Sequence, residues 1–126
     1  MIIGIGTDLI EVKRISEAID RYGERFLKRI FTALEIEYCS ARKAAPLHYA
    51  GRFAAKEATF KAMGKGWGGD ISWNEIEIYN EPSGAPHLNF YGKALALVKE
   101  KQMSAAYVTI THIEQFAAAA VVLESS

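Results

Sequence analysis

The sequence predicts an α+β fold in which a mostly antiparallel sheet packs against helices, all within a single domain over residues 1–126. Three observations support this prediction. Apolar residues recur at helical spacing between residues 12 and 63, they alternate with glutamates over 75–78, and the C-terminal run AYVTITHIEQFAAAAVVLE predicts two strands. The resulting order of strand, helices, strands, helix and strands is typical of α+β proteins. A chain of 126 residues, half of them hydrophobic, can bury one core.

The first part of the chain is predicted to be a strand followed by two helices or one broken helix. MIIGIG is a short apolar run that a glycine closes, so a strand is expected there with Asp8 directly after it. The apolar residues of 12–19 have helical spacing. This spacing stops at Gly23 and resumes over 26–31, which places a break at the glycine.

Two further helices are predicted before the middle of the chain. Thr32 with Glu35 matches a capping box, which starts a helix that extends through about Arg42. A proline is favoured in a first helical turn, so residues 46–63 predict another helix, which ends at Gly64.

The second half of the chain is predicted to supply most of the sheet. NEIEIYN has the period of a half-buried strand, NEPSGAP makes a turn, and HLNFY pairs with the first strand. GKALALVKEKQ predicts a helix with Leu95 and Val98 facing inward. The final run predicts two strands joined around HIEQ, although its alanines also suit a helix.

Composition excludes several classes of protein. No apolar run has the length of a membrane span, and the N-terminal run is interrupted by Gly4, Gly6 and Asp8 before it could form a signal sequence. We therefore expect a cytoplasmic protein without a membrane partner. A single cysteine, Cys39, excludes an intramolecular disulfide framework and a cysteine-rich zinc site, and is expected to be a core residue rather than a nucleophile.

The net charge of zero conceals an uneven distribution. Residues 1–66 contain 12 Lys and Arg against 8 Asp and Glu, a net charge of +4, whereas residues 67–126 contain 3 against 7, a net charge of −4. The basic half suits phosphates or an acidic partner protein, and a solvated helical face explains it equally well. No nucleic-acid partner is expected.

The helix that contains FAAKEATFKAM places an acid and a base among apolar residues. Because each residue of an α-helix turns by about 100°, Glu57 and Lys61 fall on one side, away from Arg52, Lys56 and Thr59. That second group is expected to be the solvated face, which leaves Glu57 and Lys61 toward the protein or a bound molecule. The alternative is a local ion pair, worth about 0.2–0.5 kcal/mol on a helix surface.

Asp8 offers a second carboxylate. An aspartate between a strand and a helix is commonly an N-cap, so a structural role stays open. Two carboxylates and a lysine also suit Mg²⁺ against a phosphate, because this ion takes one or two carboxylates and fills its shell with waters and substrate oxygens. The glycine motifs are weaker: GIGTD lacks the third glycine of a dinucleotide fingerprint, and GKGWGG lacks P-loop order and is either an anion-binding nest or a helix end.

GIGTDLIEVKRI followed by GRFAAKEATFKAMGKG closely resembles the two signature segments of the holo-[acyl-carrier-protein] synthases, which are bacterial 4′-phosphopantetheinyl transferases. The resemblance extends over the whole chain and implies the 4′-phosphopantetheinyl transferase fold. It implies transfer of phosphopantetheine from coenzyme A to a serine of apo acyl carrier protein, with release of adenosine 3′,5′-bisphosphate, in support of fatty acid biosynthesis. It also implies a homotrimer with active sites at subunit interfaces.

The resemblance assigns roles to particular residues. Asp8 and Glu57 correspond to the magnesium ligands, and Lys61 to the lysine that contacts the coenzyme A phosphates. Glu57, Asp8 and a metal-bound water all remain candidates for the base that accepts the serine proton. Around coenzyme A the resemblance places Gly64, Gly66, Pro86 and His112, and for docking of the carrier protein it places Arg14, Arg21, Arg25, Phe26 and Arg29.

Two departures and two competing functions accompany this resemblance. Lys65 and Trp67 replace the family's usual residues in the glycine-rich loop, so phosphate contacts there are expected to differ. One competing function is a non-catalytic module that binds carrier protein or nucleotide through its basic helices. The other is a structural domain in which Asp8 is a cap and Glu57 and Lys61 form a local pair.

Overall fold

The structure is a computed structural model that describes residues 1–64 and 70–126. Its elements, in chain order, are β1 (Ile2–Glu11), α1 (Val12–Tyr22), α2 (Glu24–Ile30), α3 (Ala33–Ser40), α4 (Ala45–Met63), the short 3₁₀ helix η2 (Trp73–Glu75), β2 (Ile76–Asn80), β3 (Pro86–Phe90), α5 (Gly92–Glu100), β4 (Met103–His112) and β5 (Phe116–Ser125). The predicted α+β class is confirmed.

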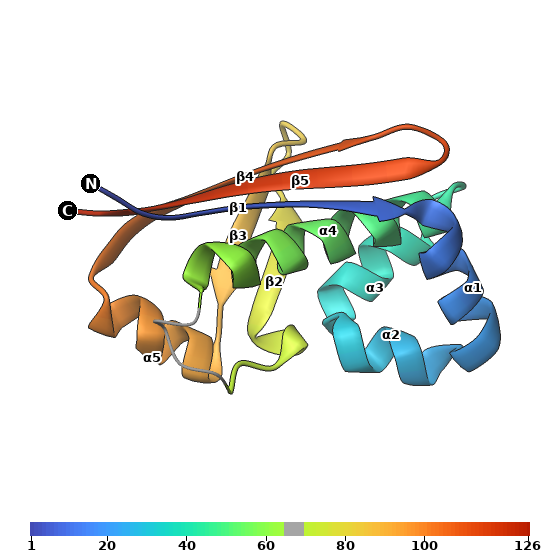
Figure 1. Cartoon of the computed structure of the whole chain (residues 1–126). Coiled ribbons are helices and arrows are strands. Elements are labelled where there is room, and N and C mark those ends of the chain that lie inside the picture. The colour runs from blue at the N-terminus through green and yellow to red at the C-terminus, as the bar shows by residue number, and fades with distance from the viewer. Residues whose placement is uncertain (65–69) are drawn as a thin grey trace.

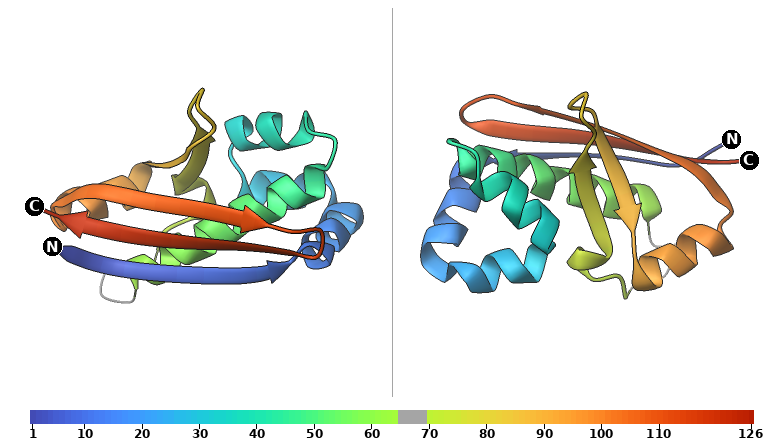
Figure 2. Two further views of the ribbon diagram at one scale, coloured as in Figure 1. Left: turned by 90° about the horizontal axis from the view of Figure 1, so that it is seen from above. Right: turned by 180° about the vertical axis from the view of Figure 1, so that it is seen from behind.

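Two antiparallel sheets and one long helix make the framework. The larger sheet has the order β1-β5-β4, and the smaller one is the hairpin β2-β3. Helix α4 runs along one face of the larger sheet, with α1 to α3 gathered at one end of the molecule and α5 at the other (Figure 1). The view from above shows the three long strands side by side over α4, with both termini at one end (Figure 2). Among the described residues, no helix lies on the opposite face of the large sheet (Figure 1).

One part of the core lies between α4 and the large sheet, and the other lies among α4, α2, α3 and β2. Ala117, Ala119, Val121 and Leu123 are buried, whereas the intervening residues of β5 are less so, which is the alternation of a strand. This pattern settles the ambiguity of the alanine run in favour of a strand. Small side chains on both the strand and α4 let the helix lie close to the sheet.

Two glycines of β1 allow α4 to touch the strand backbone. A Cβ atom on Gly6 would lie 2.0 Å from the Ala58 carbonyl oxygen, and one on Gly4 would lie 2.1 Å from the Ala62 carbonyl oxygen. These distances are far below van der Waals contact, and the blocking atoms are helix backbone that cannot rotate away. The two glycines therefore set the distance between β1, which carries Asp8, and α4, which carries Glu57 and Lys61.

We expect Gly6→Ala to lower the free energy of unfolding by about 1–3 kcal/mol or more, because the added methyl group must push α4 off the sheet. Urea unfolding followed by circular dichroism measures the loss. Thr7→Ala, at the neighbouring exposed position, is the matched control and is expected to stay within about 0.5 kcal/mol of the wild type. Equal stability of the two variants would show that the close approach is not required.

Most predicted boundaries are confirmed. Gly23 separates α1 from α2 at a φ of 55°, Thr32 and Glu35 form the capping box of α3, and Gly64 ends α4 at a φ of 65°. Two expectations are wrong at the level of single residues. Helix α3 ends at Ser40 rather than Arg42.

The inward face of α5 also differs from the prediction. Leu95 is exposed and Val98 is only partly buried, whereas Ala94 is fully buried. The buried side of α5 faces η2, β3 and β4, and Val98 packs against the core together with Ala94 and Leu97, so only the expectation for Leu95 is wrong. In the part of the chain described here, no helix is both long and apolar enough to cross a membrane.

Candidate functional site

Asp8, Glu57 and Lys61 line one groove between β1, α1 and α4. Asp8 lies within β1 rather than after it, three residues before the strand ends at Glu11, so the predicted N-cap alternative is wrong. The Lys61 ammonium lies 3.1 Å from the Asp8 carboxylate and 3.1 Å from the Thr7 carbonyl oxygen. Asp8 and Glu57, which are 49 positions apart in the sequence, thus line the same groove.

Helix α4 is rotated differently from the prediction. Arg52, Lys56 and Thr59 were expected to form the solvated face, but all three are buried. Lys56 is buried because the Glu35 carboxylate and two carbonyl oxygens surround its ammonium group, at 2.6–3.1 Å. Glu57 is half-buried and Lys61 exposed, so their side borders the groove rather than the core. The separation of the two sides is correct, and the assignment of the buried side is not.

Lys61 forms its ion pair with Asp8 and, among the described residues, forms none with Glu57. The i, i+4 pair that served as the structural alternative is therefore not formed. Because the Lys61 side chain is 56% exposed, its pairing with Asp8 contributes little to stability. The lysine remains free to contact an anion that enters the groove.

The surroundings of the Glu57 carboxyl group disfavour its ionised form. Its pKa is raised, first by burial and then by the negative charge of Asp8, and Lys61 offsets only part of this rise. A raised carboxyl pKa means that the ionised form lacks a positive partner of its own. A cation bound between Asp8 and Glu57 would supply one.

The donor set fits magnesium better than other common metals. Within the described residues, no cluster of three or more His, Cys, Asp and Glu side chains is present. Zinc usually takes at least three protein ligands and calcium six or more oxygens, whereas Mg²⁺ is held by one or two carboxylates and completes its shell with water and phosphate oxygens. Two carboxylates beside a lysine match the last pattern.

A second hollow lies on the other side of α4. It includes Pro86 and His112, which the sequence resemblance placed near coenzyme A, together with Arg52, Tyr38 and His48. The guanidinium carbons of Arg42 and Arg52 lie 3.7 and 3.9 Å from the centre of the Tyr38 ring. The hollow therefore combines an aromatic surface with positive charge.

The charge of this second hollow is not balanced locally. The pKa of His48 is lowered, first by burial and then by His112, Arg42 and Arg52, so positive groups surround it. Arg52 donates a hydrogen bond to Asn80 at 2.5 Å, but its buried Nε finds no acceptor among the described residues. An aromatic and cationic hollow of this kind suits a nucleotide with phosphate groups.

The two hollows do not open on each other within one chain. They share no lining residue. Arg52 and Glu57 are five positions apart on α4, which directs their side chains about 140° apart around the helix. Pro86 and His112 are therefore brought together, and Asp8, Glu57 and Lys61 are brought together, but one protomer does not unite the two sets.

The predicted docking residues lie on α1 and α2. Arg25, Phe26 and Arg29 line a shallow hollow with Tyr22, and Phe26 also borders the groove of Asp8 and Glu57, where Arg14 lies as well. Arg21 lies over the Tyr22 ring at 5.6 Å. A basic surface thus continues from α2 to the groove.

Two predicted residues of the glycine-rich loop have different outcomes. Gly64 is the C-cap of α4, and its amide donates to the Phe60 carbonyl oxygen at 2.9 Å. Gly66 lies outside the described residues, together with Lys65 and Trp67.

Sequence reasoning missed Tyr38, His48 and Arg52 as members of a site. Arg42 and Arg52 belong to the basic segment 41–66, and that cluster was the signal that could have found them. Cys39 is buried as expected, and burial raises the pKa of its thiol to about 12, which excludes a nucleophilic role at neutral pH.

Comparison with known proteins finds relatives over almost the whole chain. A sequence model of the 4′-phosphopantetheinyl transferase superfamily matches residues 4–121. The chain is 44% identical over 124 residues to a holo-[acyl-carrier-protein] synthase of Koribacter versatilis, with 98% of this chain and 99% of the relative covered.

Solved structures give the same fold. The chain superposes on the crystal structure of holo-[acyl-carrier-protein] synthase from Neisseria meningitidis with a TM-score of 0.90 at 33% identity, over 99% of this chain and 100% of the other. The enzyme from Bacillus anthracis, solved in complex with CoA (3′,5′-ADP), gives a TM-score of 0.82 at 38% identity, over 100% of this chain and 99% of the other.

Proposed function

The chain belongs to the 4′-phosphopantetheinyl transferase superfamily, within its holo-[acyl-carrier-protein] synthases, and we propose that it transfers phosphopantetheine from coenzyme A to a serine of apo acyl carrier protein in a magnesium-dependent reaction. The proposal includes release of adenosine 3′,5′-bisphosphate and a role in fatty acid biosynthesis in the cytoplasm. The observation that carries it is the convergence of Asp8, Glu57 and Lys61 on one groove.

The reaction forms a bond between the serine oxygen of the carrier and the β-phosphorus of coenzyme A, and breaks the pyrophosphate P–O bond. Asp8 and Glu57 would hold magnesium, which neutralises charge on phosphate oxygens when it is bound. Lys61 contacts the pyrophosphate and stabilises the negative charge that develops on the departing adenosine 3′,5′-bisphosphate.

Glu57 is the base that we propose for the serine proton. Its carboxylate borders the groove and, unlike that of Asp8, has no ion-pair partner among the described residues. Asp8 is less suited, because the Lys61 ammonium group already lies 3.1 Å from its carboxylate.

The nucleotide half of coenzyme A would occupy the hollow of Tyr38, Arg52, Pro86 and His112 on a neighbouring protomer. Two features support an oligomer. The two hollows face different sides of α4, and the helix-free face of the large sheet exposes Ile5, Leu9 and Tyr107, which are 67%, 67% and 56% exposed. Exposed apolar patches of this kind mark protein interfaces. The assembly that we propose is a homotrimer, as the family resemblance implies.

Transfer itself is tested by mass spectrometry of the carrier. Incubation of apo acyl carrier protein with coenzyme A, magnesium and this protein is expected to add one phosphopantetheine group, and a chelator is expected to prevent the addition. Binding of the carrier without any mass change, for several carriers, would support a non-catalytic binding module instead.

Carrier docking gives a prediction at α2. We expect Arg25→Glu to raise the KM for apo carrier protein by about tenfold at low salt with little change in kcat, because the reversed charge repels an acidic partner but lies away from Asp8 and Glu57. Steady-state kinetics at two salt concentrations measure the effect, which should shrink as salt rises. Lys99→Glu, an equal charge reversal on α5, is the control, and an equal effect there would contradict a specific docking surface.

A further inference from the structure

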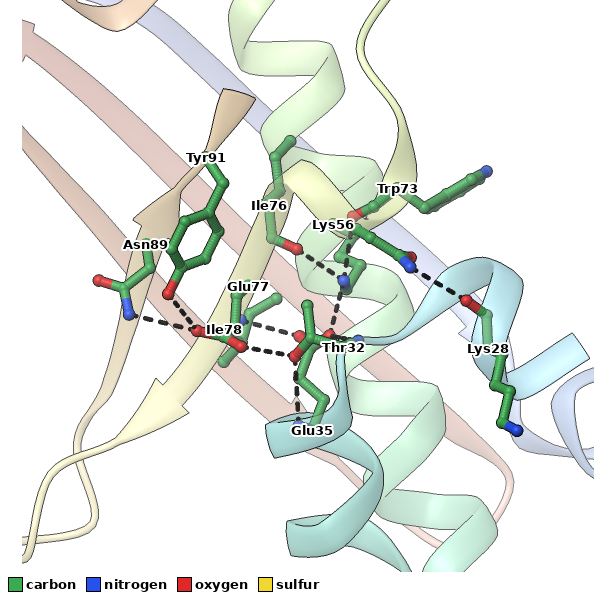
Figure 3. Close-up of polar contacts among 11 residues, drawn as sticks. Lys28, Thr32, Glu35, Lys56, Trp73, Ile76, Glu77, Ile78, Asn89 and Tyr91 are labelled. Carbon is green, nitrogen blue, oxygen red and sulfur yellow. Dashed lines mark hydrogen bonds and ion pairs between the residues drawn. The ribbon is translucent and has the colours of Figure 1, made fainter. Parts of the chain in front are cut away.

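A fully buried lysine stands next to Glu57 in the sequence and serves none of the roles assigned above. Lys56 has no exposed surface, yet its ammonium group has three oxygen partners (Figure 3). It lies 2.7 Å from the Glu35 carboxylate and donates to the carbonyl oxygens of Ile76 at 2.6 Å and Trp73 at 3.1 Å. An ammonium group has three N–H donors, so all of them are used.

Glu35 connects this lysine to two other elements. One oxygen of its carboxylate also accepts from the Thr32 amide at 2.8 Å, and the other accepts from the Ile78 amide at 2.8 Å. The pair of Glu35 and Lys56, which we call the α3–α4 lock, therefore ties the start of α3, strand β2 and η2 to α4. The Thr32 hydroxyl extends the network by donating to Glu77 at 2.6 Å, and Glu77 also accepts from Tyr91 and Asn89.

The lock constrains the groove in two ways. Lys56 immediately precedes Glu57, and fixing one helical residue fixes the direction of the next at about 100° around the axis. The carbonyl group of Trp73 is held by Lys56, while the Trp73 ring stacks on Phe53 at 5.1 Å. Phe53 lines the groove beside Glu57. The Lys56 ammonium group thus constrains the position of both the Glu57 carboxylate and the Phe53 ring in the groove.

Stability alone does not explain such a lock. A buried ion pair pays a large desolvation cost, and apolar residues of similar volume are often as good or better. The lock instead constrains the orientation of α4. The Lys56 ammonium group has oxygen partners on three different segments, so it can satisfy all of them in only one position. A magnesium ligand on the adjacent residue needs this kind of constraint, because phosphoryl transfer depends on placing the reactants accurately.

We propose that Lys56, held by Glu35, is a positioning residue that fixes the rotation of α4 so that the Glu57 carboxylate faces Asp8 across the groove. This inference rests on the proposed magnesium-dependent transfer. It predicts that the lock acts on metal binding and on kcat, and that it leaves carrier docking on α1 and α2 unchanged.

Lys56→Met is the direct test, at a temperature where circular dichroism shows the variant to be folded. We expect the kcat for transfer to fall by at least about tenfold, the magnesium concentration needed for half-maximal activity to rise by a similar factor, and the KM for carrier protein to stay within about twofold. Manganese binding in the presence of coenzyme A, followed by electron paramagnetic resonance, gives a readout independent of turnover. It is expected to weaken in parallel.

Two further variants separate positioning from loss of stability. Leu123→Ala removes a fully buried side chain near the far end of β5 and is expected to lower the melting temperature while leaving kcat and manganese affinity unchanged. Lys56→Met combined with Glu35→Gln removes the unpaired buried charge, so its melting temperature is expected to exceed that of Lys56→Met while its kcat stays low.

The outcomes are distinct. Recovery of wild-type kcat and metal affinity in the double variant, or wild-type values in folded Lys56→Met, would overturn the positioning role. If Lys56→Met does not fold, Glu35→Gln, which keeps both carbonyl partners of Lys56, must still weaken manganese binding for the proposal to stand. A wild-type protein without transferase activity would instead refute the proposed function, whatever the variants do.

Discussion

Glu57→Gln is expected to lower the kcat for phosphopantetheine transfer by at least about two orders of magnitude without loss of the fold. The substitution removes both the proposed general base, which typically contributes about 10²–10⁴ in rate, and one of two proposed magnesium ligands. The amide keeps the shape of the side chain, so packing around it is preserved. Mass spectrometry of the carrier after timed incubation measures the rate.

Glu57→Gln is expected to raise the stability of the metal-free protein at neutral pH, although it lowers kcat. Because the pKa of Glu57 is raised in the folded protein, its protonated form is favoured by folding. The resulting stability is present at low pH and is lost as pH rises through the raised pKa. The metal-free Glu57→Gln protein lacks this loss, so it should melt above the wild type at neutral pH, and the difference should disappear on acidification.

Melting curves of metal-free protein across pH check this sign. Glu100→Gln, on the exposed surface of α5, is the control and is expected to melt like the wild type at each pH. A Glu57→Gln protein that keeps wild-type kcat would remove Glu57 from the chemistry. A lower melting temperature at neutral pH would show that the carboxylate has a stabilising partner that the groove does not reveal.

Mixing two inactive variants is expected to restore activity if, as proposed, the metal-binding half and the nucleotide-binding half of each site come from neighbouring protomers. One variant is Glu57→Gln, which keeps the nucleotide half. The other carries Arg42→Glu and His112→Glu, two exposed positions at the hollow of Tyr38, and keeps the metal half. Each alone is expected to be almost inactive, since it lacks one half at every interface.

Co-expression with two different affinity tags isolates the mixed assemblies. In a head-to-tail trimer that contains both variants, one of the three interfaces pairs the two intact halves, so about a third of wild-type activity is expected. The control is each variant co-expressed with a tagged copy of itself, which should stay inactive. Tandem-purified mixed assemblies without activity would show that each protomer builds its site alone.

Local patterns were sufficient to predict most elements. The break at Gly23, the capping box at Thr32 and the end of α4 at Gly64 depend on backbone conformations and hydrogen bonds among near neighbours, so their signals lie in short stretches of sequence. The smaller hairpin followed equally from the alternation of residues in β2. Asp8 was misplaced because glycine in a strand was interpreted as its end, whereas Gly4 and Gly6 permit contact with α4.

The orientation of α4 could not be predicted in the same way. Helical spacing correctly separated Glu57 from Lys56, but whether a lysine faces solvent depends on its partners. The partner of Lys56 is Glu35, 21 residues earlier on another helix, and its other acceptors are backbone carbonyl groups, which leave no mark on sequence. Tyr38, His48 and Arg52 were missed for a related reason, since they meet Pro86 and His112 only in the folded chain.

Asp8 and Glu57 are proposed to hold the metal of a site that a neighbouring protomer completes. Crystals grown with coenzyme A and Mn²⁺, in place of Mg²⁺, test this proposal directly through the anomalous scattering of manganese. We expect one anomalous peak between the two carboxylates at each interface, with the nucleotide against Arg52 and His112 of the adjacent chain. A peak remote from Asp8 and Glu57, or a nucleotide bound to the same chain as the metal, would contradict the account.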